Sequence, residues 1–159
     1  MKKTKKILGI VGCIALIPFL SGCEKQAEEK IITCTLYKKD VVSNYELNST
    51  YKVYAKGKVV NKVETTEIIN SESDYIIEYF EETLKTTYSA MDKAYGGYDI
   101  EVTKEGNKVT SVTTINYNEL NIDQLAKDEA SIKAILTKDN KVSLDGIKSL
   151  YEQMGAECK

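Results

Sequence analysis

Cysteines are the side chains of this sequence that could do covalent chemistry, and there are four of them: Cys13, Cys23, Cys34 and Cys158. The sequence contains no histidine, so it lacks the commonest general base and the commonest zinc ligand. It also contains no arginine, the side chain that holds a carboxylate or phosphate with two hydrogen bonds. Nucleophiles activated by histidine are therefore excluded, and no glycine-rich phosphate loop precedes a helix. The sequence predicts no catalytic residue, no metal site and no cofactor.

Cys23 has the sequence context of a lipid-modified cysteine. It follows Leu20-Ser21-Gly22, a basic N-terminus and the short apolar run from Ile7 to Leu20. That run is shorter than the roughly 20 apolar residues that a membrane-spanning helix needs, and the whole pattern is typical of an export signal. Leu-Ser-Gly-Cys is a lipobox, in which the thiol receives a diacylglyceryl group and the chain is cut before the cysteine. We expect residues 1–22 to be removed and the protein to be anchored by lipid to the extracytoplasmic face of a bacterial membrane.

The remaining 137 residues are acidic. They carry 18 lysines against 24 acidic residues, a net charge of −6. A nucleic-acid-binding protein needs a basic face, so this class is excluded, and charge does not favour adhesion to an anionic bilayer. The lipid is therefore the expected contact with the membrane. The length suits one domain, for which we expect residues 31–159, preceded by the lipidated cysteine and a polar tether at 23–30.

Cys34 and Cys158 remain after processing, one near each end of the predicted domain. In an exported chain two such thiols predict a disulfide. The bond would close a loop of about 125 residues, worth roughly 4–5 kcal/mol in the chain-entropy model. Two separate buried thiols are the alternative at this stage.

Hydrophobic periodicity predicts an α+β fold. β-branched and aromatic residues predict a strand at 31–37, and alternating residues predict hairpins at 50–69 and 98–117, each with glycine in its turn. The polar stretch 38–48 is predicted to be a loop. We expect an antiparallel sheet built from the two hairpins plus the N-terminal strand, packed against one long helix and two shorter C-terminal helices.

The long helix is predicted over residues 71–95, ended by Gly96-Gly97. Its apolar stripe predicts that Ile76, Phe80, Leu84 and Met91 pack on the sheet, whereas Glu81 and Glu82 lie on a solvated face. Asn121 is expected to cap a helix at about 122–136, and Ser143 a last helix that Gly155 ends.

Tyrosine is unusually frequent in this chain, which contains 11 of them. A tyrosine ring with its polar tip suits sugars, peptides or a protein partner. We therefore single out Tyr75, Tyr79, Tyr95 and Tyr98, on the long helix and at its exit, as a candidate binding surface. The alternative is that these rings form the outer layer of the core.

Several segments resemble a known family. The lipobox is followed by Thr33-Cys34-Thr35, the strand sequence 51–60 with a threonine-rich return, the segment 112–117 and a C-terminal Val-Ser-Leu helix start at 142–144. This pattern resembles the YehR-like family of small bacterial lipoproteins of unknown function, over roughly residues 31–158. The resemblance implies an α+β domain on a lipid tether and supplies no active-site residue.

We expect a non-catalytic binding or interaction module of the cell envelope, with a protein or glycan partner. Two alternatives stay open: an envelope enzyme that uses carboxylates on glycans, and a small solute receptor. The chain is short for a two-lobed receptor. A carboxylate pair in a concave pocket would favour the enzyme, and an exposed tyrosine patch would favour the binding module.

Overall fold

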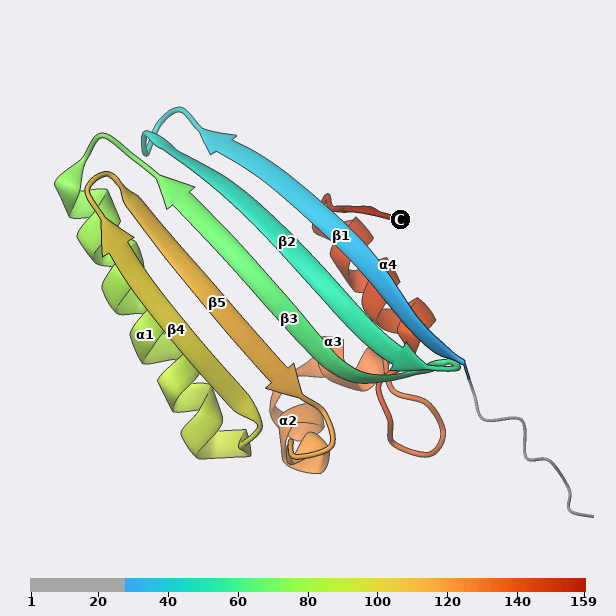
Figure 1. Ribbon diagram of the computed structural model, residues 1–159. Coiled ribbons are helices and arrows are strands. Elements are labelled where there is room, and N and C mark those ends of the chain that lie inside the picture. The colour runs from blue at the N-terminus through green and yellow to red at the C-terminus, as the bar shows by residue number, and fades with distance from the viewer. Residues whose placement is uncertain (1–27) are drawn as a thin grey trace, which may run out of the picture.

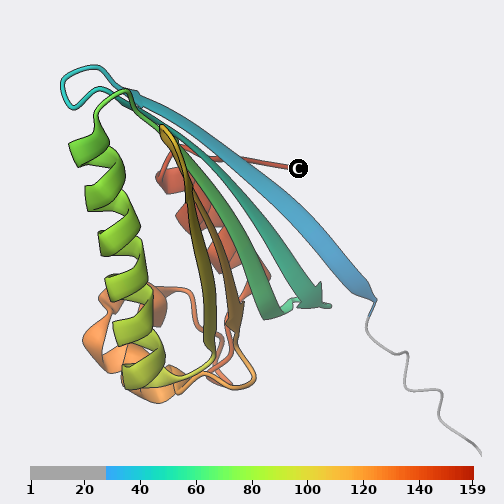
Figure 2. The same cartoon turned by 60° about the vertical axis from the view of Figure 1, so that its left-hand side comes forward.

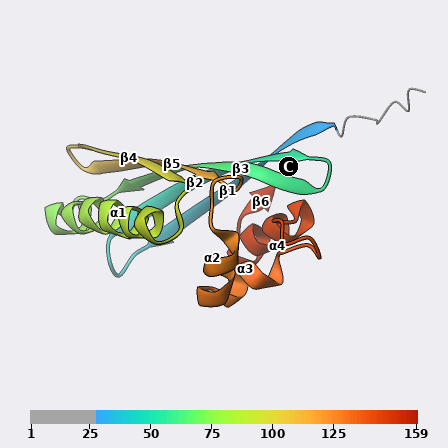
Figure 3. The ribbon, with the colours of Figure 1, turned by 90° about the horizontal axis from the view of Figure 1, so that it is seen from below.

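The computed structural model describes residues 28–159, which form one antiparallel sheet with helices on a single face. Six strands follow the order β4-β5-β3-β2-β1-β6 (Figure 1). The strands are β1 (Glu29–Asp40), β2 (Tyr45–Lys56), β3 (Val59–Asn70), β4 (Tyr98–Glu105), β5 (Lys108–Asn116) and β6 (Glu157–Cys158). The helices are α1 (Asp74–Tyr95), α2 (Ile122–Asp128), α3 (Ala130–Ala134) and α4 (Leu144–Gln153). Figure 3 shows all of them below the sheet, so the predicted α+β class is confirmed.

The first hairpin is longer than predicted, because 38–48 is mostly strand rather than loop. β1 and β2 pair over their whole length, from Glu29 opposite Lys56 to Asp40 opposite Tyr45, around a short turn. Lys39, Glu46 and Asn48 of this stretch lie on the open face of the sheet, where Lys39 is opposite Glu46. Leu47 and Tyr45 alternate with them and contact the core. The loop prediction is therefore wrong for most of this stretch, because polar residues on one face of a strand resemble the composition of a loop. β1 also begins inside the predicted tether, at Glu29.

Strand β6 is absent from the sequence prediction, which does include the disulfide between Cys34 of β1 and Cys158 of β6. Cys34 lies directly opposite Cys158, with their sulfur atoms 1.95 Å and their Cα atoms 4.0 Å apart. Backbone hydrogen bonds between Thr33 and Lys159 continue this pairing in both directions. The chain end therefore lies alongside the first strand, and the predicted disulfide is the one that the structure contains.

Helix α1 covers the side of the sheet formed by β4 and β5 (Figure 2). Its fully buried residue is Ile77, which packs with Ile69 and Val109. The predicted stripe of Ile76, Phe80, Leu84 and Met91 is only half-buried. Phe80 and Leu84 of this stripe pack against the same cluster, as predicted. Ile77, the most deeply buried residue of the helix, is absent from the predicted stripe. Gly96 and Gly97 end the helix with positive φ, as expected.

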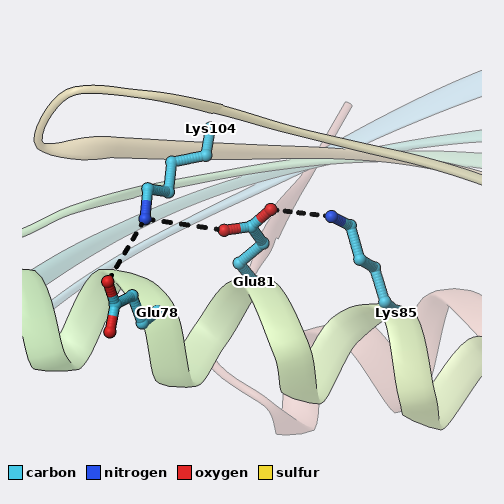
Figure 4. A network of polar contacts seen from close by, with 4 residues as sticks. All are labelled: Glu78, Glu81, Lys85 and Lys104. Atoms are coloured by element: carbon cyan, nitrogen blue, oxygen red, sulfur yellow. Dashed lines mark hydrogen bonds and ion pairs between the residues drawn. The ribbon is translucent and has the colours of Figure 1, made fainter.

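An ion network ties α1 to the edge strand (Figure 4). Lys104 of β4 lies 3.6 Å from a Glu78 carboxylate oxygen and 3.8 Å from one of Glu81. Glu81 also pairs with Lys85 at 2.7 Å. Glu81 therefore faces the sheet edge, which corrects its predicted place on the solvated face, whereas Glu82 is exposed.

The C-terminal helices cover the opposite half of the same face. The predicted helix 122–136 is broken at Glu129, which adopts an extended conformation between α2 and α3. Both predicted caps are confirmed: the side chain of Asn121 accepts from Gln124 N at 3.2 Å, and that of Ser143 accepts from Gly146 N at 3.3 Å. Val142, Ile147 and the ring of Tyr151, which stacks on Tyr51, build a second core there.

The two ends of the sheet differ. Strand β1 begins at one end, together with the β2–β3 turn. At the other end lie the β1–β2 turn, the start of α1 and the β4–β5 turn, at the upper left of Figure 1. We call this second end the tip, made of residues 40–46, 70–75 and 105–108. Twelve extended residues put it about 40 Å from the start of β1. Over residues 28–159 no helix is both long and apolar enough to cross a bilayer.

Candidate functional site

A groove of about 620 Å³ opens at the tip. Three segments that lie far apart in the sequence build it: the β1–β2 turn, the β3–α1 junction and the β4–β5 turn. It is lined by Lys39, Asp40, Val41, Asn44, Tyr45, Glu46, Asn70, Ser71, Glu72, Glu105, Asn107 and Lys108. Its size lies within the usual range for a small-molecule or peptide-segment site.

Ser71 holds the three segments of the tip groove together. It is buried, and its hydroxyl donates to the backbone oxygen of Asn44 at 2.6 Å. Its backbone N–H donates to the backbone oxygen of Asn107 at 3.1 Å. Asn44 has a φ of 53°, in the left-handed region that asparagine tolerates better than most residues. The groove wall is therefore fixed by hydrogen bonds rather than left as free loops.

Charges alternate across the last row of the sheet. Lys39, Glu46, Asn70, Lys108 and Glu105 lie opposite one another on β1, β2, β3, β5 and β4. Lys39 pairs with Glu46 at 2.6 Å, and Lys108 with Glu105 at 2.9 Å. These contacts lower the pKa of Glu46, through the Lys39 hydrogen bond, and that of Glu105, through the Lys108 hydrogen bond. We call this set the end row.

Apolar side chains are exposed beside the groove. Val42 at the β1–β2 turn is 97% exposed and Tyr75 in the first turn of α1 is 74% exposed. Val41 and Tyr79 are exposed as well, and Tyr79 contacts Phe80, which packs edge-on against Tyr45. Isolated exposed apolar residues are ordinary, and these four are grouped toward one end of the sheet. The tip thus combines a polar groove with an apolar rim.

The four predicted binding tyrosines do not form one surface. Tyr75 lies at the tip and Tyr79 one helical turn from it, whereas Tyr95 ends the 22-residue helix α1, about 30 Å away, and Tyr98 begins β4 beside it. The Tyr95 hydroxyl donates to Asp128 at 3.0 Å. Burial raises the pKa of Tyr98 to about 12, and its ring lies near that of Tyr88. Tyr98 is therefore a packed side chain, and the Tyr95 hydroxyl already has a partner within the chain. Cys23 lies outside the described residues.

The two cores are separated by a buried polar seam that the sequence analysis does not predict. Ser49, Glu67 and Ser111 are neighbours on β2, β3 and β5, and all three face the helices between the two cores. Within residues 28–159, Ser49 Oγ and Glu67 Oε2 are buried and have no hydrogen-bond partner. Burial raises the pKa of Glu67. The alternation of Val63, Thr65 and Ile69 could have revealed this inward carboxylate.

The described residues contain no group of three or more histidine, cysteine or acidic side chains placed to hold a metal ion. Glu78 and Glu81 are held by lysines. Glu67 has serines as its cross-strand neighbours. The arrangement at the tip is suited to hydrogen bonding, ion pairing and apolar contact with a ligand.

No protein-family model and no curated protein matches this chain. Two solved structures share its fold. One is an NMR structure of a protein from Streptococcus pneumoniae TIGR4, with 15% identity and a TM-score of 0.53, covering 100% of this chain and 98% of that one. The other is the NMR structure of the E. coli YehR protein, with 17% identity and a TM-score of 0.54, covering 83% and 91%. The fold is thus YehR-like, in agreement with the resemblance in the sequence.

Proposed function

We propose that the protein is a non-catalytic, lipid-anchored binding module of the bacterial cell envelope, and that the tip is its contact surface. The observation that carries this proposal is the placement of the groove and its apolar rim at one end of the sheet, opposite the start of β1. The lipobox cysteine precedes that start by a few residues. A lipid on Cys23 would hold the start of β1 near the membrane.

In this arrangement the strands act as a spacer. The tip stands about 40 Å from the membrane end of β1, because β1 and β2 extend without interruption. Groove amides at Asn44, Asn70 and Asn107 can bind a peptide or glycan, and the rim of Val42 and Tyr75 can add apolar contact. A protein or glycan partner in the envelope fits this chemistry.

Photocross-linking from single positions tests this proposal. A photoreactive phenylalanine in place of Val42 is expected to cross-link the full-length chain to an envelope partner in living cells, and the change Tyr75→Ala/Tyr79→Ala should reduce the yield several-fold. The same probe at Ser89, exposed on α1 away from the tip, is the matched control. Digestion by protease or by a cell-wall hydrolase then tells a protein partner from a glycan.

The Cys23→Ala chain tests the anchor in the same cells. It is expected to incorporate no fatty acid and to lose the cross-link from position 42, because the tip is no longer held at its place in the envelope. Equal cross-linking from positions 42 and 89 would contradict the tip as the contact surface. Fatty-acid labelling of the Cys23→Ala chain would contradict the anchor.

A further inference from the structure

The face of the sheet opposite the helices is open in the described structure (Figure 3). Side chains alternate between the two faces of each strand. Because Cys34, Thr65 and Val109 are buried under the helices, the residues next to them in the sequence lie on the open face. Ile31 and Tyr37 on β1 are 61% and 59% exposed, and Val112 on β5 is exposed too. Threonines such as Thr35, Thr50 and Thr66 lie opposite one another between them. β-Branched and aromatic side chains of this kind pack well between two sheets.

We propose that this open face binds a second copy of the same chain, related by a two-fold axis that runs parallel to the strands along β3. Such a dimer is a sandwich of two sheets, with β1 and β2 of one copy over β4 and β5 of the other. Since β3 is the middle of the five long strands, it would face itself across the axis.

The charges of the end row support this axis. Read from β1 to β4, the row is positive, negative, neutral, positive and negative: Lys39, Glu46, Asn70, Lys108 and Glu105. Read from β4 to β1, every sign is reversed. Rotation about an axis parallel to the strands lays the reversed row over the original one. Lys39 then faces Glu105, and Glu46 faces Lys108, so each charge meets its opposite.

The rest of the face brings no unpaired like charges together. Lys52 of one copy faces Thr114 of the other, and Asp99 faces Thr33, because these residues share one cross-strand row. Lys62 and Glu64 of β3 both lie on the open face near the axis, so each meets its own copy. The two opposite charges pair with each other at 2.7 Å within one copy, and Glu64 also accepts from the Tyr54 hydroxyl at 2.5 Å. The arrangement is therefore electrostatically compatible along its length.

The area of the face and the position of the chain start agree with a dimer. Five strands about 4.8 Å apart and about 30 Å long present about 700 Å², close to the roughly 800 Å² that each partner contributes to a standard stable interface. A two-fold axis parallel to the strands leaves the direction of β1 the same in both copies, so β1 of each copy begins at the same end of the dimer. Two copies anchored in one membrane can therefore meet, at a raised effective concentration; this last point rests on the proposed anchor.

Single cysteines on the open face test the geometry in the full-length chain. Thr66→Cys, on β3, is expected to form a disulfide-linked dimer on mild oxidation at least several-fold faster than Ser89→Cys, on the helical side. Thr103→Cys, on β4, should not link to itself, but it should link to Tyr37→Cys when the two chains are co-expressed, since these positions face each other across the axis. Equal rates at positions 66 and 89, or self-linking at 103, would overturn the proposal.

Charge exchange in the Thr66→Cys chain separates the interface from contacts within one copy. Lys39→Glu places two negative charges, at positions 39 and 105, opposite each other across the proposed interface. It is therefore expected to slow dimer cross-linking several-fold. Adding Glu105→Lys restores the reversal between copies, although it leaves both intramolecular pairs broken, and cross-linking should recover. No recovery in the double variant would overturn the assigned axis. Lys39 and Glu105 also line the tip groove, so partner capture is compared in the Thr66→Cys chain without the charge changes, whereas cross-linking at position 66 reports on the sheet face.

Discussion

The position of Glu67 disfavours the charged form of its carboxylate. Its Oε2 atom is buried in the polar seam without a hydrogen-bond partner in the described structure, and burial raises the pKa of the group. A group whose pKa is higher in the folded state binds its proton more tightly there. It therefore stabilises the fold at a pH below the unfolded pKa, and this stabilisation is lost as the pH rises through the folded pKa.

The stability of the protein is accordingly expected to fall as pH rises from about 4.5, the ordinary Glu value, through the raised pKa of Glu67. Glu67→Gln cannot ionise, so the variant should lose this dependence and should be more stable than the wild type at pH 7, by about 1 kcal/mol. Urea unfolding midpoints between pH 4.5 and 8 measure both effects.

Glu64→Gln is the control for this series. Glu64 lies on the opposite face of the same strand, and hydrogen bonds from Lys62 and then Tyr54 lower its pKa. Its contribution to stability is therefore present above the unfolded pKa and is lost on acidification, so Glu64→Gln should not stabilise the protein at pH 7. A Glu67→Gln variant with the pH dependence of the wild type would contradict the assignment.

At the scale of elements, α4 depends on one close approach. Gly146 lies in its first turn, and a Cβ atom at this position would be 2.9 Å from Ile135 Cβ and 3.1 Å from the Ile135 backbone oxygen. In an ordinary helix interior, replacing Gly by Ala stabilises by roughly 0.5–1 kcal/mol. Here the backbone that follows α3 occupies the space.

Gly146→Ala is expected to destabilise the protein by about 1–2 kcal/mol, because overpacking typically costs about 1–3 kcal/mol and outweighs the gain in helix propensity. Urea unfolding compared with Ser149→Ala, at an exposed position of the same helix, measures this effect. A stabilised Gly146→Ala variant would show that α4 can shift away from Ile135.

Elements with local chemical signals were predictable from the sequence. The caps at Asn121 and Ser143 and the end of α1 at Gly96 follow from side chains within a few residues. The second half of the β1–β2 hairpin was missed because its polar residues lie on the open face, and β6 was missed because two residues carry no periodicity. The break at Glu129 has no glycine or proline to announce it.

At the scale of the molecule, one covalent bond joins the first strand to the chain end. Cys34 is fully buried and Cys158 is 124 residues away. The double variant Cys34→Ala/Cys158→Ala is expected to lose about 4 kcal/mol of stability, mainly because its unfolded chain is no longer constrained. Urea unfolding measures the loss, and wild-type protein with and without reductant is the control. A difference below about 1 kcal/mol would contradict this expectation.

Half of the candidate site could be predicted. Tyr75 and Tyr79 were singled out by residue type, and they lie at the tip and one helical turn from it. The groove itself was not foreseen, since Lys39, Ser71 and Asn107 come together only through the register of five strands. Tyr95 and Tyr98 were grouped with the others because they share a helix, but helix length separates them.

The direction of the strands has a mechanical consequence. A pull applied between the start of β1 and a ligand held at the tip runs along the strands, whereas the hydrogen bonds of an antiparallel ladder lie across them. Such tension shears many hydrogen bonds at once instead of peeling them one by one. The Cys34–Cys158 bond passes part of that force from β1 to the C-terminal end of the chain. A protein built in this way resists stretching along its long axis far better than across it.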